Sequence, residues 1–477
     1  MSAEQKDQHP EDQPTCRLPK KRLRAAIECE RLLLATCARD RLLGVLPAVQ
    51  LDALMAAHCS KHRSRLFPPE VTLGLFMEQV ISSDPTCQEA VGRYLSQRAA
   101  LGLGACSLGT GGFCRARKRL PAPFVEACAR AVADIAAAAL PAAARWRGRE
   151  IKLIDGTQIS MPDMPELQAV YPQNKQQQPG LGFPQVRVVG VVSLSSGCAL
   201  NWTLSPCEGK GSGEPTQLWN LLGGFSTGDL VIADRIYCTY FLLAAMQQRG
   251  IDFVIRENAN RKNDSVHKVN LGRDDRILVW TRPAKPAWMD DATYAQIPEA
   301  MRVREVKDGA RMIVTSLCDP AAVPATEIAW LYRQRWAIEL DFHSIKEALQ
   351  MSVLRCKSKD MVRKEIAAHL LGYNLIRVVM GEAARPEGLC LRTLSFAAAR
   401  RAASLYQTNL RWIATPRHRA QARFLMLQQT AHFRIPDRPG RVEPRAVKRR
   451  PKPRTLLTEP RHLARARILK QQQAMRA

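Results

Sequence analysis

Several classes of protein are excluded by what this 477-residue sequence lacks. It contains no run of about 18 uncharged apolar residues, so no membrane-spanning helix is expected. The richest candidate, 131–144, is mostly alanine and is interrupted by Asp134 and Pro141. The first 14 residues, MSAEQKDQHPEDQP, are polar and acidic, unlike a signal or transit peptide. We therefore expect a cytoplasmic protein that does not associate with membranes.

The cysteines are also spaced in a way that excludes two kinds of site. None of the 14 forms a C-x-x-C pair; they are scattered singly from Cys16 to Cys390, so neither a zinc cluster nor a disulfide framework is expected. A phosphate-binding loop is missing as well. Around Lys210 the motif would need Gly at 204 and Ser or Thr at 211, where the chain has Leu204 and Gly211. We predict no bound nucleotide.

Acidic residues are scarce relative to basic ones. The chain has 71 Lys and Arg against 44 Asp and Glu, a formal net charge of +27. Such an excess predicts a polyanionic partner, and a nucleic-acid backbone fits best. From Arg411 onward 18 basic residues face three acidic ones, which leaves +12 for the rest of the chain. The charge predicts a nucleoid-associated protein, although it specifies a partner and not an activity.

The chain divides into regions of different composition. Residues 1–20 are polar and are expected to be disordered. Residues 21–147 have helical periodicity and predict a helical N-terminal domain. Within it the basic segment Gly112–Leu120 is either a DNA-contacting helix or a solvated basic face. Residues 386–477 are expected to be helical at first and then a basic, disordered tail that includes Arg449–Arg454.

Residues 148–385 predict an α/β domain. Short apolar runs that favour strands, with a helical segment between the last two, are Ile151–Ile154, Val186–Leu194, Ala199–Leu204, Leu230–Ala233 and Phe253–Arg256. This order predicts one central sheet. Residues 259–310 are more polar and contain further strand candidates, so we interpret them as a β-rich insertion. One more strand is then followed by two long helices, at about 325–350 and 362–384.

The first of these long helices carries the most informative pattern. At 100° per residue, Tyr332, Arg335, Glu339 and Lys346 fall within a sector of roughly 60°, beside an apolar stripe that would face the core. One helix thus presents a phenol, a guanidinium, a carboxylate and an ammonium in a row. A plain surface strip of ion pairs is the alternative, because such pairs are common on helices.

Two aspartates follow apolar strand candidates. Asp155 follows Ile151–Ile154, and Asp234 follows Leu230–Ala233. Taken singly, Asp155-Gly156 is also typical of a hairpin turn, and Asp234 could be an ordinary surface residue. Together with Glu339 they supply two carboxylates near the ends of central strands and a third on a helix that could pack over them.

These segments resemble a known family. Tyr332, Arg335, Glu339 and Lys346, with two, three and six residues between them, resemble the signature of the IS-four family of bacterial DDE transposases. IDGTQISMPD around Asp155, VIADRIY around Asp234 and the stretch YPQNKQQQPGLGFPQVR are also similar to segments of that family. The resemblance implies a ribonuclease-H-like catalytic domain with a β-rich insertion before the glutamate helix. It also implies an N-terminal DNA-binding domain.

The resemblance implies metal-dependent chemistry on DNA. Asp155, Asp234 and Glu339 would hold two Mg²⁺ ions, for which Mn²⁺ can substitute, and Asp155 would be shared. The expected reaction is cleavage of insertion-element ends and strand transfer into target DNA by a cut-and-paste route. The expected partners are double-stranded DNA ends and target, bound by a homodimer. The alternatives are a ribonuclease-H-like nuclease or domesticated relative, and a non-catalytic DNA-binding protein, against which the intact triad argues.

The remaining signature residues would bind DNA ends. Arg335 and Lys346 suit a terminal phosphate through fork geometry and point charge. Tyr332 suits an unstacked terminal base or its phosphate. Arg256 follows a strand candidate and either adds a contact to the DNA backbone or is a plain surface charge.

Overall fold

The computed structural model describes most of the chain. The described residues are 40–60, 66–104, 107–258, 265–410, 412–413, 415–436 and 457–475. The predicted disordered segment 1–20 and the basic run Arg449–Arg454 both lie outside them.

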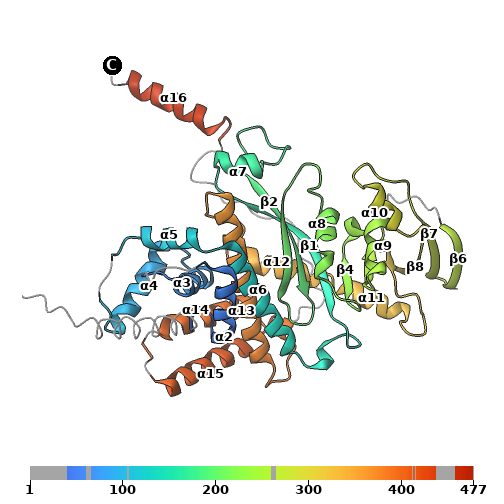
Figure 1. Ribbon diagram of the computed structural model, residues 1–477, viewed down its shortest axis with the longest axis horizontal. Coiled ribbons are helices and arrows are strands. Elements are labelled where there is room, and N and C mark those ends of the chain that lie inside the picture. Colours follow the sequence, from blue (N-terminus) through green and yellow to red (C-terminus); the bar gives the residue numbers. More distant parts are fainter. Residues whose placement is uncertain are drawn as a thin grey trace, which may run out of the picture.

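One mixed sheet runs through the described part of the chain (Figure 1). Its strands are β1 (Ile151–Ser160), β2 (Gln185–Ser193), β3 (Ala199–Pro206), β4 (Leu230–Ala233), β5 (Asp252–Arg256), β6 (Ser265–Gly272), β7 (Asp275–Thr281), β8 (Ala300–Asp308) and β9 (Arg311–Thr315). Their order is β3-β2-β1-β4-β5-β9-β8-β7-β6. Strands β1, β4 and β5 are parallel, and all other neighbours are antiparallel. The prediction of an α/β fold around one central sheet is confirmed.

The structure decides the conformation of residues 155–156 and the sheet to which the insertion at 259–310 belongs. Residues 155–156 do not turn: β1 continues through them and pairs with β2 as far as Ser160, so the hairpin alternative is wrong. The insertion at 259–310 does not form a sheet of its own. Strand β9 runs antiparallel to β5, and its free edge is extended by β8, β7 and β6, because an exposed strand edge offers unpaired backbone groups.

Helices cover both faces of the sheet and continue into a large helical region. They are α2 (Ala48–His58), α3 (Pro69–Ile81), α4 (Cys87–Ala100), α5 (Gly111–Arg119), α6 (Ala122–Ala138), α7 (Pro165–Val170), α8 (Glu214–Leu221), α9 (Tyr240–Gln248), α10 (Asp291–Gln296), α11 (Ala325–Arg333), α12 (Trp336–His343), α13 (Lys359–Ala384), α14 (Phe396–Leu410), α15 (Pro416–His432) and α16 (Arg461–Ala474). Within the described ranges, none of them is both long and apolar enough to cross a membrane.

Successive side chains of β1 face two different hydrophobic cores, one on each side of the sheet. Ile151 and Leu153 face the core shared with α11, α12 and α13, whereas Ile154 faces the core shared with α8 and α9. Successive side chains of a strand point to opposite faces, so every later residue of β1 is assigned to one side by this count. The two sides carry different parts of the candidate site.

The helices that precede the sheet share a core with those that follow it. Helix α13 packs against α6, both helices contact β3, and most of α13 is buried. The fully buried Asn374 of α13 donates hydrogen bonds to the carbonyl oxygens of Ala129 in α6 and Ala199 in β3, each at 2.9 Å. A smaller core around Phe67, Tyr94 and Phe113 joins α3, α4 and α5.

The expectation of an irregular basic tail from residue 411 is wrong for two segments. Residues 416–432 form α15, which Thr415 caps by accepting a hydrogen bond from the His418 N–H. Met426 and Thr430 of α15 are buried. Residues 461–474 form α16, which projects away from the body in Figure 1. Composition alone missed these helices because their basic residues are also good helix formers.

Candidate active site

Charged residues lie at the same level on three neighbouring strands. Strands β1, β4 and β5 are aligned in register, so Asp155, Asp234 and Arg256 follow the positions Ile154, Ala233 and Ile255 that pair across them. Leu153 and Ile232 face the core on the α12 side of the sheet. Because side chains alternate along a strand, Asp155 and Asp234, each two residues further on, lie on the same face.

Helix α12 packs close to Asp155 because its partner on β2 is a glycine. Gly190 lies opposite Asp155 in the β1–β2 register. A Cβ atom at residue 190 would lie 3.2 Å from the Phe342 ring of α12, tighter than an ordinary contact. Phe342 is one helical turn from Glu339. The glycine therefore lets α12 bring Glu339 toward the strand-end aspartates.

A buried ion cluster fixes α12 from behind. Asp341 is completely buried and accepts hydrogen bonds from Arg377 of α13 at 2.5 Å and from Arg392 at 3.1 Å. A buried carboxylate needs such partners, because leaving it unpaired costs several kcal/mol. The sequence pattern gave no sign of this cluster, which fixes the helix two residues beyond Glu339.

Arg335 bridges two of the predicted carboxylates. Its guanidinium donates to Glu339 Oε1 at 2.6 Å and lies 3.9 Å from Asp155 Oδ2. Burial is the largest cause that raises the pKa of Asp155 to about 6, and the charges of Glu214 and Glu339 raise it further. The Gly156 N–H, which donates to Asp155 Oδ1 at 2.8 Å, and the charge of Arg335 act in the opposite direction. The site holds more negative charge than Arg335 neutralises.

Tyr332 and Lys346 lie on either side of this cluster. Tyr332 is 5% exposed, and burial raises the pKa of its phenol, as does the charge of Asp234, while Arg335 and Arg256 lower it. Lys346 Nζ donates to Thr157 Oγ1 at 3.0 Å, two residues beyond Asp155. All seven residues proposed from the sequence therefore lie at this end of β1, β4 and β5 or on the helical segment over it.

The prediction of one regular α-helix over 325–350 is wrong. Helix α11 ends at Arg333 and α12 begins at Trp336. Between them the backbone bonds run from each residue to the third before it, as from Arg335 N to Tyr332 O. A π-helical turn, η4 (Ser344–Ala348), then follows α12. The segment is thus overwound before Glu339 and underwound at Lys346, so a uniform 100° rotation per residue does not describe it.

The carboxylate oxygens are donors of the kind that divalent cations prefer. Among the described residues, no three His, Cys, Asp or Glu side chains are close enough to hold a metal ion together. Glu339 is instead held by Arg335. The donor set is nevertheless all oxygen, and the pKa of Asp155 is raised first by burial and then by the charges of Glu214 and Glu339. These properties fit a hard divalent cation such as Mg²⁺.

Sequence reasoning missed three residues that the structure adds to the site. Glu214, the first residue of α8, lies over Gly156, and Thr157 is the hydrogen-bond partner of Lys346. Arg311 of β9 contributes charge near Tyr332. An acid at a helix start and a lone arginine are ordinary features of surfaces, so only the tertiary arrangement distinguishes these residues.

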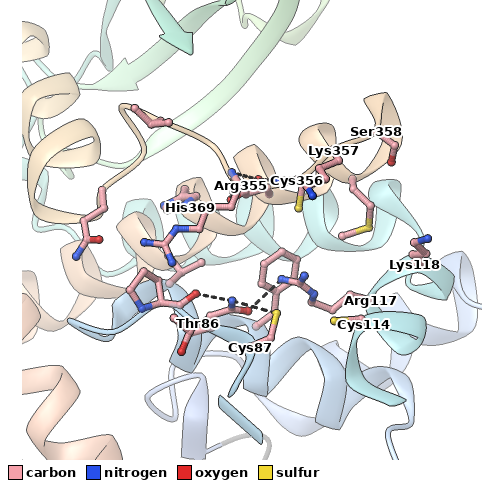
Figure 2. A pocket seen from close by; sticks show the side chains of 18 of the residues that line it. Thr86, Cys87, Cys114, Arg117, Lys118, Arg355, Cys356, Lys357, Ser358 and His369 are labelled. Carbon is pink, nitrogen blue, oxygen red and sulfur yellow. Dashed lines mark hydrogen bonds between the residues drawn. The ribbon is translucent and has the colours of Figure 1, made fainter. Parts of the chain in front are cut away.

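A basic cavity of about 650 Å³ lies between the N-terminal helices and the segment that follows η4 (Figure 2). Arg117, Lys118, Arg355 and Lys357 border it. Thr86 and Ser358, which precede α4 and α13, line it as well, and helix N-termini favour anions. His369 at its wall is 6% exposed; burial lowers the pKa of this histidine to about 3, so it is neutral.

The arrangement can be compared with known proteins. Two aspartates on neighbouring parallel strands and a glutamate on the helix that packs over them are the residue types that metal-dependent phosphoryl-transfer enzymes use. Residues 146–375 match the model of the Transposase DDE domain. This segment, just under half of the chain, is therefore similar to the catalytic domain of DDE transposases.

Individual transposases are similar to parts of this chain. The "Transposase InsG for insertion sequence element IS4" of Escherichia coli (strain K12) is 29% identical over 245 residues, 49% of this chain and 53% of that protein. The candidate transposase y4zB of Sinorhizobium fredii is 28% identical over 32% of this chain and 43% of its own length. The candidate transposase InsZ of Escherichia coli is 26% identical over 42% of this chain and 64% of its own length. The chain thus spans about half the length of the first of these relatives.

One solved structure is also similar. A piggyBac transposase synaptic complex with hairpin DNA aligns with 86% of this chain and 87% of its own, with a TM-score of 0.40 and 9% identity. A likeness this weak supports no detailed correspondence.

Proposed function

We propose that this protein is a DNA transposase that cleaves the ends of an insertion element and transfers them into target DNA by a cut-and-paste route. The observation that carries the proposal is the placement of Asp155, Asp234 and Glu339 at one end of the sheet, within the segment that matches the transposase domain. We assign these three residues as catalytic.

The domain organisation is part of the same proposal. Residues 148–385 form a ribonuclease-H-like catalytic domain with an insertion at 259–310. The order β3-β2-β1-β4-β5, antiparallel for three strands and then parallel, supports this assignment. Residues 21–147 bind DNA, which is supported by the basic last turn of α5, where Arg117, Lys118 and Arg119 lie. Residues 386–477 supply further basic surface.

Two Mg²⁺ ions, with Mn²⁺ as a substitute, would be held by Asp155, Asp234 and Glu339, with Asp155 shared. When bound, they would stabilise the negative charge on the attacking and leaving oxygens of a phosphodiester. The chain's own residues prepare the site. Gly190 admits α12 so that Glu339 approaches the aspartates, and Asp341 holds the helix there. Partial burial of Asp155 would strengthen its attraction for a cation.

DNA is the proposed partner, and the basic residues provide its binding surface. Arg335 and Lys346 would bind phosphates next to the scissile bond, Tyr332 a terminal base, and Arg256 the backbone. The cavity bordered by Arg117, Lys118, Arg355 and Lys357 provides a second set of cations for phosphates further along the duplex. A homodimer on paired ends stays a prediction from the family resemblance.

The test is cleavage of a labelled duplex that carries the element's end. Asp155→Asn, Asp234→Asn and Glu339→Gln should each abolish Mg²⁺-dependent nicking while circular dichroism and DNA binding stay near normal. The matched control is Glu347→Gln, because Glu347 is an exposed acid on η4 beyond α12. Near-normal nicking by any one of the three variants would remove that residue from the site.

The same assay separates the alternatives. Nicking followed by joining of the freed 3′ end to target DNA supports a transposase. Nicking without joining supports a ribonuclease-H-like nuclease or a domesticated relative. Binding without nicking at any divalent cation would leave only a DNA-binding protein.

A further inference from the structure

Glu214 approaches β1 from the face of the sheet opposite to α12. It is the first residue of α8, whose core residues pack on the side that Ile154 faces. Gly156 faces the same side. A Cβ atom at residue 156 would lie 2.5 Å from Glu214 Oε1 and 2.7 Å from Oε2. The glycine is therefore required by the close approach of a carboxylate, and Asp155 has acidic neighbours on both faces of its strand.

Glu214 is also bound to the turn that carries the second aspartate. Tyr237 Oη donates a hydrogen bond to Glu214 Oε2 at 3.0 Å. Tyr237 is completely buried and ends the short helix η3 (Arg235–Tyr237), which begins directly after Asp234. One carboxylate thus connects the strand segment of Asp155 with the turn of Asp234.

The charge of Glu214 is only partly compensated. The nearest cation is Arg187 of β2, whose Nε lies 3.6 Å from Glu214 Oε1. This Nε is buried and makes no hydrogen bond within the described part of the chain, whereas Nη1 donates to the Ser212 carbonyl at 2.8 Å. At 3.6 Å the pair is electrostatic and not a direct hydrogen bond. Negative charge therefore remains behind Asp155.

We infer that Glu214 is a positioning residue of the carboxylate site, which fixes the spacing between Asp155 and Asp234 and raises the affinity of the site for a divalent cation. The inference rests on the proposed function. Glu214 would not touch the cation or the DNA, because it lies on the opposite face of β1. Groups that orient metal ligands in this way typically contribute about 10–100-fold to metal affinity.

Calorimetric titration of the full chain with Mn²⁺, without DNA, tests this role directly. Glu214→Gln keeps the shape and the acceptor for Tyr237 but removes the charge, and should weaken Mn²⁺ binding about tenfold. Glu208→Gln is the matched control. Glu208 is a glutamate on the loop between β3 and α8, paired with the exposed Lys175 at 3.0 Å, and its replacement should leave the affinity unchanged.

Two further variants test the geometry. Gly156→Ala places a methyl group where the Glu214 carboxylate lies, and the flexible end of that side chain can move aside without disrupting the strand. Tyr237→Phe removes the hydrogen bond but keeps the charge. Both should weaken Mn²⁺ binding, and all three variants should need more Mg²⁺ for half-maximal cleavage while approaching the wild-type rate at saturating Mg²⁺.

The outcomes are distinguishable. If Glu214→Gln folds and binds Mn²⁺ with wild-type affinity, the inference is overturned. This holds even if the melting temperature of the variant falls. If Glu214→Gln does not fold, unchanged affinity in Gly156→Ala overturns it equally. Wild-type protein that neither binds Mn²⁺ nor cleaves DNA would instead refute the proposed function, and the inference with it.

Discussion

Lys346 and Thr157 are joined by a hydrogen bond of 3.0 Å, which ties the π-helical turn to β1 two residues beyond Asp155. The lysine does not pair with Glu339, whose carboxylate is occupied by Arg335. An ammonium held by a neutral hydroxyl keeps its charge for another partner. This relationship favours a role for Lys346 in holding DNA over a role in an ion pair within the helix.

Lys346→Ala should therefore impair binding to precut DNA ends more than binding to internal duplex, with little change in melting temperature. Electrophoretic mobility shifts on the two substrates, beside a melting curve, measure both effects. Thr157→Val is the control, because it removes the hydrogen bond but keeps the ammonium. If Thr157→Val reproduces the defect, or if Lys346→Ala loses both substrates alike, the lysine acts only through structure.

Under the proposed function, Arg335 would compete with a cation for the carboxylates. Because its guanidinium contacts Glu339 and lies 3.9 Å from Asp155, Arg335→Gln should tighten Mn²⁺ binding by DNA-free protein about tenfold or more while cleavage is lost. Arg333→Gln is the control, since Arg333 is an exposed neighbour paired with Asp308. Calorimetry gives the affinities. Weaker Mn²⁺ binding by Arg335→Gln would show that the guanidinium supports the metal site instead.

The raised pKa of Asp155 predicts how the metal-free protein responds to pH. With a pKa of about 6 in the folded state against 3.8 in the reference state, the folded protein holds this proton more tightly, so stability is lost as pH rises through 6. Two pKa units correspond to at most about 3 kcal/mol. Asp155→Asn should thus melt a few degrees above wild type at pH 7 in EDTA, and the difference should vanish below pH 3.8, where the carboxyl is protonated in both states. An equal difference at both pH values would contradict the assignment.

The basic cavity predicts a change in salt dependence. If Arg355 and Lys357 each neutralise a phosphate, Arg355→Ala with Lys357→Ala should lower the slope of log binding constant against log salt by about two. Fluorescence anisotropy across salt concentrations measures the slope. Lys285→Ala with Lys307→Ala is a matched control, because both lysines are paired with aspartates on the far part of the sheet. An unchanged slope in the first pair would place the duplex elsewhere.

Removing residues 437–477 should weaken non-specific DNA binding and flatten its salt dependence, because the segment carries 13 basic and three acidic residues. Truncation at 411 would be misleading, since α15 is packed against the body through Met426 and Thr430. The shorter truncation keeps α15 intact, so its melting temperature should match that of the full chain. A salt slope equal to wild type would show that the segment does not contact DNA.

Local sequence patterns are sufficient to predict much of the fold and the three carboxylates of the candidate site. Strand β4 is a run of four buried apolar residues followed by Asp234, and the strand period alone places that side chain beside Asp155 once the two strands are parallel neighbours. The helix-borne Glu339 was found by spacing because the signature lies within 15 residues. These parts are specified by residues that are close in sequence.

The remainder depends on contacts between distant residues. Glu214 meets Gly156 across 58 positions, and nothing in the periodicity of either segment indicates that approach. The change in winding around Arg335 and Lys346 is equally absent from composition. Likewise, the insertion strands join the central sheet only because β9 returns beside β5.

The burial of Asn374 between α6 and β3 bears on how this protein can acquire new specificity. The helices that precede the sheet in the chain pack against a helix that follows it. The N-terminal region is therefore not an independent module that can be exchanged as a unit. A chimera joined near residue 147 would replace one wall of a shared interior and leave the apolar flank of α13 without its complement. Under the proposed function, recognition of different DNA ends would be reached more readily by substitutions on exposed turns of α4 and α5 than by exchange of whole segments.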